Sequence, residues 1–418
     1  MTDAKYDLDT TTAPVPLLEP REGVPPVVAT EDALARVIEA FANGEGPVAV
    51  DAERASGYRY GQRAYLVQIR RAGAGTALID PIACPDLGGL GKAIADAEWV
   101  LHAAPQDLPC LAELGMRPRR LFDTELAGRL AGFARVGLAS IIEEILGYSL
   151  EKSHSAVDWS TRPLPEPWLR YAALDVEVLI ELRDALAEEL SRQGKLAWAL
   201  EEFAAIAAAP VPTPRPDPWR RTSGVHKIRK PRQLAVVRAL WEARDQVAQE
   251  RDLSPNRVLP DSAIIEAALA MPRSARDLAA VPGFSGRGMR RGLGYWFAAV
   301  REAYTLPEHQ LPAPGTTREG PPPARAWGEK NPEAAERLQA VRTAVAAIAD
   351  EHRLPAENLL SPDSVRRLTW SPPEDLGEES IAAALRGLGA REWQIRLTAV
   401  AISKALKRLR TRREVEHD

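Results

Sequence analysis

The stretch Val48-Ala-Val-Asp-Ala-Glu53 decides how the first part of the chain folds. Its β-branched and small apolar residues predict a short strand, and Tyr65-Leu-Val-Gln-Ile69 predicts a second strand soon after it. Because side chains alternate along a strand, Asp51 and Glu53 are expected on one face and the two valines on the other. Two neighbouring carboxylates at the end of an apolar strand repel each other unless a cation lies between them. The pattern therefore predicts a divalent-cation site, although a solvated strand end is the commoner outcome for an isolated Asp-x-Glu pair.

Further acids follow at defined places in the predicted elements. Asp107 comes after the apolar run Val100-Leu101 and a turn, so it should lie near a helix N-terminus, where Asp is common as a cap. Tyr171 and Asp175 are four residues apart in a helix that we expect to begin near Pro165, so they share one helix face. Taken singly, these residues are a helix cap, a core or rim aromatic and a solvated acid. The specific signal is the ordered set.

Proline-rich stretches at residues 210–218 and 306–323 divide the chain, because proline interrupts both helix and sheet ladders. The first block mixes strand and helix patterns and predicts an α/β domain, whereas the other two lack strand patterns and predict all-helical domains. A weak likeness between residues 252–261 and 353–363 predicts an internal duplication of the helical module. The predicted domains are residues 27–209, 230–304 and 331–412, with linkers at 210–229 and 305–330.

Composition narrows the class of protein. The 418 residues include 54 Lys and Arg and 58 Asp and Glu, which gives a net charge of −4. The overall charge therefore gives no reason to expect that the chain as a whole binds a polyanion. The charge is segregated, however: residues 27–209 contain 18 basic and 27 acidic residues, and residues 219–304 contain 16 and 8. Two cysteines are too few for a disulfide framework or a thiolate zinc site. The acidic, proline-rich residues 1–26 predict a disordered tail. Because the sequence has no run of about 18 apolar residues, we expect a cytoplasmic location and no membrane association.

The motifs around the acids resemble the tyrosine-containing DEDD family of 3′ to 5′ exonucleases, and most closely its ribonuclease D branch. The helical block at 230–304 resembles the helicase-and-RNase-D C-terminal (HRDC) domain well, and the block at 331–412 resembles it loosely. The resemblance implies a multidomain protein, with an α/β ribonuclease H-like exonuclease domain built on a mixed sheet and two all-helical HRDC-like domains after it. The stretches that carry the likeness in the first block are Val48–Glu53, Tyr58–Tyr60, Ala64–Ile69, Leu101–Leu108, Phe122–Thr124, Asp158–Leu164 and Tyr171–Val176.

The resemblance also implies the chemistry. Two divalent ions roughly 3.5–4 Å apart can activate a water and stabilise the leaving oxygen of a phosphodiester, and hard oxygen ligands select Mg²⁺ or Mn²⁺. Tyr171 would orient the attacking water, because a phenol with a reference pKa near ~10 is a poor base at neutral pH. The implied activity is a 3′ to 5′ exoribonuclease that trims structured RNA such as tRNA precursors and releases nucleoside 5′-monophosphates. The implied metal ligands are Asp51, Glu53, Asp107 and Asp175.

Other polar residues near these motifs have two interpretations each. Gln68 and His102 either touch the terminal nucleotide or are satisfied core groups. Arg162 either binds a phosphate with two hydrogen bonds or forms an ion pair with Asp158. We interpret Asp123 as a helix cap rather than a metal ligand.

The helical blocks are expected to contribute unequally to RNA binding. A glycine-rich corner in the first block can offer backbone N–H groups to a phosphate, with charge added by Arg287, Arg290 and Arg291; a plain helix–helix turn is the alternative. The second block has an acidic stretch there instead, and we expect Trp370 and Trp393 to pack in its core. We expect this block to form a ring or clamp around the substrate or to support the first block.

Two other functions stay open from the residues alone. The first is a DNA 3′ to 5′ exonuclease, because the same carboxylates and HRDC modules occur in DNA metabolism and no residue here discriminates a 2′-hydroxyl. The second is a nucleic-acid-binding scaffold with an inert exonuclease domain, against which the presence of the whole acidic set argues. RNA is the expected partner, with DNA as the second choice, and the chain is expected to be a monomer.

Overall fold

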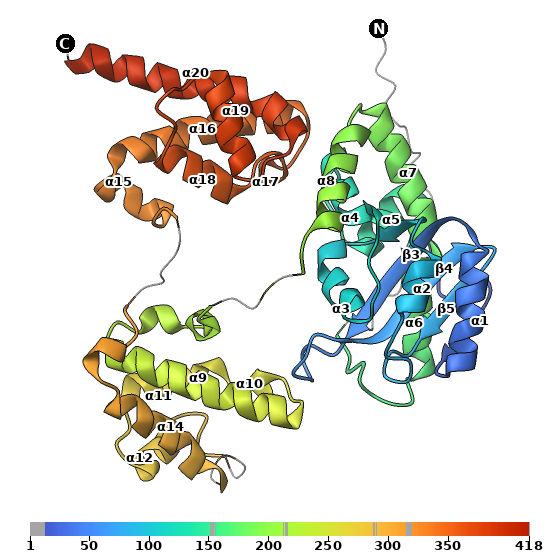
Figure 1. Ribbon diagram of the computed structural model, residues 1–418, viewed down its shortest axis with the longest axis horizontal. Helices are drawn as coiled ribbons and strands as arrows, with labels where there is room; N and C mark the ends of the chain where they lie inside the picture. Colours follow the sequence, from blue (N-terminus) through green and yellow to red (C-terminus); the bar gives the residue numbers. More distant parts are fainter. Residues whose placement is uncertain are drawn as a thin grey trace.

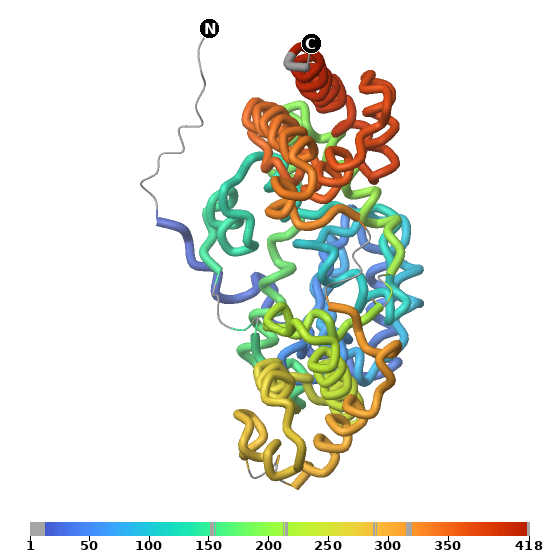
Figure 2. Tube along the Cα trace, turned by 90° about the vertical axis from the view of Figure 1, so that its left-hand side faces the viewer, coloured from blue at the N-terminus to red at the C-terminus, as the bar shows by residue number. Residues whose placement is uncertain are grey.

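The computed structural model describes residues 13–150, 154, 156–211, 213, 216–286, 289, 291–314 and 320–417. These residues form an α/β domain followed by two helical domains (Figure 1). Figure 2 shows the two helical domains toward opposite ends of the molecule, and Figure 1 shows both of them on the same side of the α/β domain. Among the described helices, none combines the length and the apolar composition that a membrane crossing needs.

A six-stranded mixed sheet forms the centre of the α/β domain, in the order β2-β5-β4-β3-β6-β7. β4 is antiparallel to β3 and β5, whereas β6 is parallel to β3 and β7, which confirms the predicted mixed sheet. Because β3 and β6 are parallel, their C-terminal ends meet at the same edge of the sheet. The strands are β2 (Val27–Val28), β3 (Glu45–Arg54), β4 (Ala64–Ala72), β5 (Gly75–Ile79), β6 (Glu98–Leu101) and β7 (Arg120–Asp123).

The N-terminal segment differs from the predicted disordered tail. Residues 1–12 lie outside the described residues, but β1 (Val15–Leu17) pairs in parallel with β8 (Tyr148–Leu150). The backbone N–H of Val15 also donates to the carbonyl of Gly147 at 2.8 Å. The short apolar segment is held because β8 satisfies its backbone hydrogen bonds.

Helices pack against the sheet and place the later motifs over it. α6 begins directly after Pro165, as predicted, and packs against β3, β4 and β5. α7 follows at once and packs against β3 and β6. The helices of this domain are α1 (Glu31–Ala42), α2 (Gly88–Ala93), α3 (Leu108–Glu113), α4 (Thr124–Ala131), α5 (Leu138–Leu146), α6 (Glu166–Glu177), α7 (Leu179–Arg192) and α8 (Leu196–Ala208), with a 3₁₀ turn η1 (Ala104–Gln106).

The two helical domains repeat one local pattern. In each, a residue with positive φ follows a long helix, Asp252 (46°) directly and Arg353 (52°) two residues after the helix end, and a one-turn helix and a further helix come next. These are the two segments whose sequences align, so the structure supports the predicted duplication. The first helical domain contains α9 (Pro231–Arg251), α10 (Pro255–Val258), α11 (Asp261–Ala270), α12 (Ala275–Ala280) and α14 (Leu293–Thr305). The second contains α15 (Trp327–Lys330), α16 (Pro332–Glu351), α17 (Ala356–Leu359), α18 (Pro362–Trp370), α19 (Glu378–Gly387) and α20 (Glu392–His417).

The second helical domain shares its hydrophobic core with the α/β domain. Trp198 of α8 stacks on Trp393 of α20, with ring centroids 5.1 Å apart and planes 9° apart. The indole N–H of Trp393 donates to Glu202 at 3.0 Å. Most buried apolar residues of the two domains form one continuous cluster, and a smaller cluster around Trp159 lies within the α/β domain. The first helical domain has a separate cluster of its own.

The first helical domain contacts the α/β domain through polar groups of the loop between β3 and β4. The hydroxyl of Tyr60 donates to Asp245 at 3.0 Å. Arg257 donates to the carbonyl of Gly57 at 3.0 Å, and its guanidinium lies 4.2 Å from the ring centroid of Tyr58. The contact therefore rests on hydrogen bonds and charge more than on buried apolar surface.

Candidate active site

Three of the predicted metal ligands converge at one edge of the sheet. Asp51 and Glu53 lie near the end of β3, and Asp175 reaches them from α6, which crosses this part of the sheet. Each residue offers one carboxylate oxygen, and the three oxygens lie within 4.8 Å of one another. All three side chains are buried or nearly so. This geometry suits a hard divalent cation, because carboxylate oxygens are the ligands that such ions prefer.

The fourth predicted ligand, Asp107, approaches the same edge from the turn after β6. The turn is held by Asp123, whose carboxylate accepts hydrogen bonds from the backbone N–H groups of Ala103 (3.1 Å) and Ala104 (2.9 Å). Asp123 also caps α4, as predicted, by accepting from the next backbone N–H groups along the chain. Asp107 occupies the N-cap position of α3 but makes no capping hydrogen bond with its side chain. It forms instead an ion pair with Arg54, at 3.1 Å.

The electrostatics of the site follow from burial of like charges. Burial raises the pKa of Asp51, and burial together with the neighbouring carboxylates raises the pKa of Glu53 and Asp175 well above their ordinary values. Burial and the charge of Asp51 raise the pKa of Asp107 to about 8, even though Arg54 acts in the opposite direction. Binding of protons or cations therefore relieves the repulsion between the buried carboxylates, as expected of a metal-binding cluster.

Tyr171 lies one helical turn before Asp175 on α6, and its hydroxyl is close enough to that carboxylate for each group to affect the pKa of the other. Burial and the nearby carboxylates raise the pKa of Tyr171, so the phenol keeps its proton at neutral pH. Its ring packs edge-on against His154, with centroids 5.8 Å apart, and lies 6.4 Å from the ring of Trp159. The aromatic packing fixes the hydroxyl beside the acids, where it can orient a water but cannot act as a general base.

Gln68 lies inside the acidic cluster rather than at its rim. It is opposite Asp51 in the β3–β4 ladder, and its amide nitrogen donates to Asp51 (3.2 Å) and Glu53 (3.4 Å). The side chain is fully buried, and its amide oxygen has no hydrogen-bond partner among the described residues. Gln68 therefore bridges the two carboxylates and holds them in place. The geometry favours this role over contact with a nucleotide.

His102 and Arg162 are engaged in structural contacts. The Nδ1 of His102 lies 3.0 Å from the hydroxyl of Thr124, and burial lowers the pKa of His102 to about 4, so the ring is neutral. Arg162 makes five hydrogen bonds, two to the carboxylate of Asp80 at 2.8 Å and three to backbone carbonyls. The expected ion pair is present, but its acid is Asp80 and not Asp158. Neither a nucleotide contact of His102 nor a phosphate contact of Arg162 gains support.

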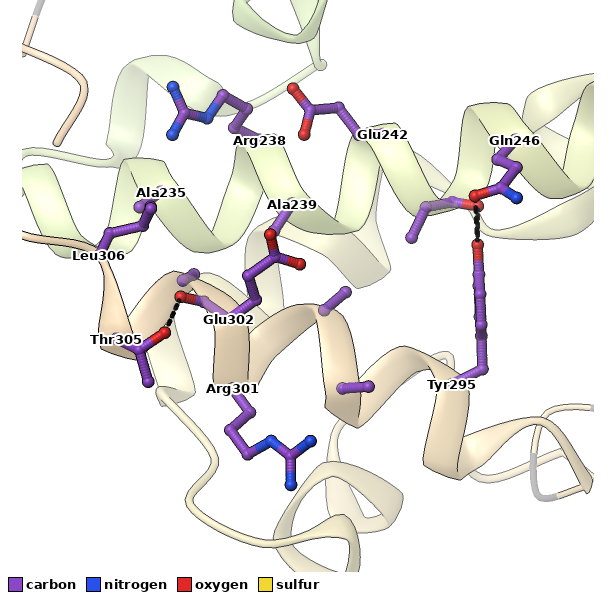
Figure 3. Close-up of a pocket in the computed structure, with 14 residues that line it drawn as sticks. Ala235, Arg238, Ala239, Glu242, Gln246, Tyr295, Arg301, Glu302, Thr305 and Leu306 are labelled. Carbon is purple, nitrogen blue, oxygen red and sulfur yellow. Dashed lines mark hydrogen bonds between the residues drawn. The ribbon is translucent and has the colours of Figure 1, made fainter. Parts of the chain in front are cut away.

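The expected phosphate-binding corner of the first helical domain is described only in part. Arg291 is exposed, whereas Arg287 and Arg290 lie outside the described residues. A groove of about 580 Å³ runs between α9 and α14 of the same domain, and Figure 3 shows Arg238 and Arg301 on opposite sides of it, pointing away from each other. Glu242 and Glu302 line the groove as well, so it does not concentrate positive charge.

Comparisons with known proteins follow the same division of the chain. Residues 25–191 match the family model of a 3′-5′ exonuclease, residues 233–300 match the HRDC domain, and residues 320–406 match the 3′ to 5′ exonuclease C-terminal domain. Ribonuclease D of Gluconacetobacter diazotrophicus is 32% identical over 364 residues, which cover 84% of this chain and 88% of that protein. The chain belongs to the ribonuclease D family. Like the family, it is a 3′ to 5′ exoribonuclease that depends on divalent metal and acts on RNA.

Solved structures agree with membership in the ribonuclease D family. A protein from Bifidobacterium adolescentis has a TM-score of 0.87 and 40% sequence identity, covering 94% of this chain and all of its own. The crystal structure of Escherichia coli RNase D, described as an exoribonuclease involved in structured RNA processing, has a TM-score of 0.69 and 29% identity, covering 92% of this chain and 98% of its own. We call the three domains the exonuclease, HRDC and C-terminal domains. The last of these, which we expected to be a divergent HRDC domain, matches a family model of its own.

Sequence reasoning did not identify Arg54 as part of this ribonuclease D site. It follows Glu53 directly and occupies the last position of β3. The sequence feature that could have identified it is a basic residue directly after two clustered acids. Its partner, Asp107, could not be inferred, because that contact depends on how the ends of β3 and β6 meet.

Proposed function

We propose that Asp51, Glu53, Asp107 and Asp175 hold two divalent ions, Mg²⁺ or Mn²⁺, and that Tyr171 positions the attacking water. The observation that carries the proposal is the convergence of three carboxylate oxygens within 4.8 Å, with the carboxylate of Asp107 ion-paired beside them. Bound divalent ions supply a more acidic water and stabilise negative charge on the leaving 3′ oxygen. Release of nucleoside 5′-monophosphates, one at a time, is the outcome expected of this chemistry.

The protein's own residues prepare the site for that reaction. Gln68 keeps Asp51 and Glu53 in place by donating to both. Asp123 fixes the turn that carries Asp107. The protonated phenol of Tyr171 can hold a water by its oxygen while donating its own proton to a carboxylate.

We propose structured RNA as the substrate, with tRNA precursors foremost, processed by a monomer. Support comes from the Escherichia coli relative, which is described as acting in structured RNA processing. The HRDC region adds positive charge, with 16 basic against 8 acidic residues at 219–304, so binding should be sensitive to salt and only weakly sequence-specific. We further propose the domain limits 27–209, 230–304 and 331–412, which lie close to the matched regions.

The test is degradation of a 5′-labelled RNA by Asp51→Asn and Asp175→Asn variants, with EDTA treatment and Mn²⁺ add-back for the wild type. Both variants should lose at least about a thousandfold in rate, because removing a ligand removes charge stabilisation of the transition state. RNA affinity should persist. The matched control is Asp96→Asn, a surface acid whose side chain is 94% exposed and which should retain full activity. Near-normal turnover of either site variant with Mn²⁺ would refute the ligand assignment.

A second assay compares a tRNA precursor with a single-stranded RNA and with a DNA strand of the same sequence. The proposal expects the precursor to be shortened from its 3′ end and the DNA to be cut at least about tenfold more slowly, a difference of about 1.4 kcal/mol. Equal rates on RNA and DNA would contradict the substrate assignment without affecting the metal-site assignment.

A further inference from the structure

Among the described residues, Arg54 is the basic side chain that forms an ion pair with one of the four site carboxylates. Its guanidinium lies 3.1 Å from Asp107, whose side chain is 6% exposed, while the side chain of Arg54 is 26% exposed. The arginine is the residue after Glu53 on β3, so the strand that carries two predicted ligands also carries the group that engages a third. The ion pair joins the end of β3 to the start of α3, which follows the turn after β6.

This ion pair distinguishes Asp107 from the other three acids of the site. The carboxylates of Asp51, Glu53 and Asp175 lie together, and no arginine or lysine among the described residues forms an ion pair with any of the three. Asp107 is outside that group and is already compensated by a positive charge. One ion can therefore bind the three acids without breaking the ion pair between Arg54 and Asp107, whereas an ion that uses Asp107 has to share that carboxylate with Arg54 or displace the arginine.

We propose that Arg54 is a positioning residue that holds Asp107 and competes with the second divalent ion for it, so that the two ions bind with unequal affinity. The inference rests on the proposed ligand set. A guanidinium next to a divalent ion is repelled at short range, and the cost falls on whichever ion binds closer to it. Partial exposure gives Arg54 a route out of the site toward solvent when that ion arrives.

Titration of the full-length protein with Mn²⁺ in the absence of RNA, followed by electron paramagnetic resonance or calorimetry, measures both affinities without any turnover. Arg54→Met should tighten the weaker site about tenfold and change the stronger site less than about twofold, because the competing charge is gone while the bulk of the side chain is kept. Arg54→Lys should stay near the wild type. Arg54→Gln provides a second neutral variant if Arg54→Met does not fold.

Two further variants distinguish an error in the proposed ligand set from an error in the proposed competition. Arg119→Met removes an exposed arginine that pairs with Asp96, and it should leave both affinities unchanged. Asp107→Asn should abolish the weaker site and leave the stronger one. If Asp107→Asn still bound two ions, the proposed ligand set would be wrong; if it lost the weaker ion but Arg54→Met showed unchanged or weaker binding, the competition alone would be refuted.

Discussion

The HRDC and C-terminal domains are attached to the exonuclease domain in different ways. The C-terminal domain, which is the more distant along the chain, buries Trp393 against Trp198 and shares one apolar core with the exonuclease domain. The HRDC domain, which is nearer along the chain, has its own core and contacts the exonuclease domain through Tyr60, Arg257 and neighbouring polar groups. Separating an apolar contact exposes buried surface to water, which costs free energy, whereas water can replace exposed hydrogen bonds and ion pairs at little cost. We therefore expect the C-terminal domain to be a fixed part of the enzyme and the HRDC domain to be the part that moves.

The largest effect that tests this comparison is expected for Trp393→Ala. Trp393 is fully buried in the shared core, so its removal should lower the free energy of unfolding of the exonuclease and C-terminal unit by about 3–5 kcal/mol. Denaturant unfolding followed by circular dichroism measures the change. The control is Trp296→Ala, in the core of the HRDC domain, which should destabilise that domain alone. A single transition affected equally by both variants would contradict the division into two units.

Metal binding should stabilise only the unit that contains the acids. Mn²⁺ at about a hundredfold over its dissociation constant should raise the melting temperature of the exonuclease and C-terminal unit by about 5–10 °C, and that of the HRDC domain not at all. Calorimetry with and without Mn²⁺ tests this expectation. Asp51→Asn should remove the effect.

The same experiment has a predictable pH dependence. The folded protein raises the pKa of the site carboxylates, with Asp107 at about 8, so the folded state binds more protons than the unfolded state above pH ~4. Without added ions, stability should therefore fall as pH rises from about 5 to about 8. Divalent ions bind the deprotonated carboxylates, so the stabilisation by Mn²⁺ should be larger at pH 8 than at pH 6. An equal or smaller effect at pH 8 would contradict this reasoning.

A smaller effect is expected for Arg257→Ala at the polar contact. The variant loses a hydrogen bond to the carbonyl of Gly57 and the contact with the ring of Tyr58, together about 1–2 kcal/mol. Small-angle scattering should show a larger radius of gyration at high salt, while the unfolding of the shared-core unit stays unchanged. Arg276→Ala, an exposed position in the same domain, is the control. No change in the radius of gyration at any salt concentration would indicate that the HRDC domain is held by other forces.

The smallest effect is expected for Tyr60→Phe, which removes a single hydroxyl. Its hydrogen bond to Asp245 contributes about 0.5–1.5 kcal/mol. A double-mutant cycle with Asp245→Ala, using domain separation in rising salt as the readout, should give a coupling energy in that range. Additive effects of the two substitutions would show that the hydrogen bond does not contribute to docking.

The sequence predicted those parts of the enzyme that depend on local pattern. Alternation along a strand placed Asp51 and Glu53 together, and a four-residue spacing on a helix placed Tyr171 beside Asp175. The interpretation of Asp123 as a helix cap, a common role for Asp, is confirmed by its position at the N-terminus of α4. These predictions hold because each depends on the geometry of a single element.

The parts that sequence could not give are contacts between elements distant in the chain. For Arg162 the sequence left open a phosphate contact and an ion pair with the nearby Asp158, but the side chain pairs with Asp80, which the fold brings beside it. The ion pair between Arg54 and Asp107 depends on the parallel arrangement of β3 and β6. The sharing of one core by the exonuclease and C-terminal domains likewise depends on tertiary packing and not on any periodicity.

A substitution at Asp123 is easily mistaken for the loss of a metal ligand. Its carboxylate ties together two stretches of main chain, the turn that leads to Asp107 and the start of α4. Loss of that carboxylate would let the turn relax, including Ala103, which has a φ of 58°. A substitution at Asp123 should then imitate the inactivity of a ligand mutant, and an alanine scan judged by activity alone would count one acid too many in the catalytic set.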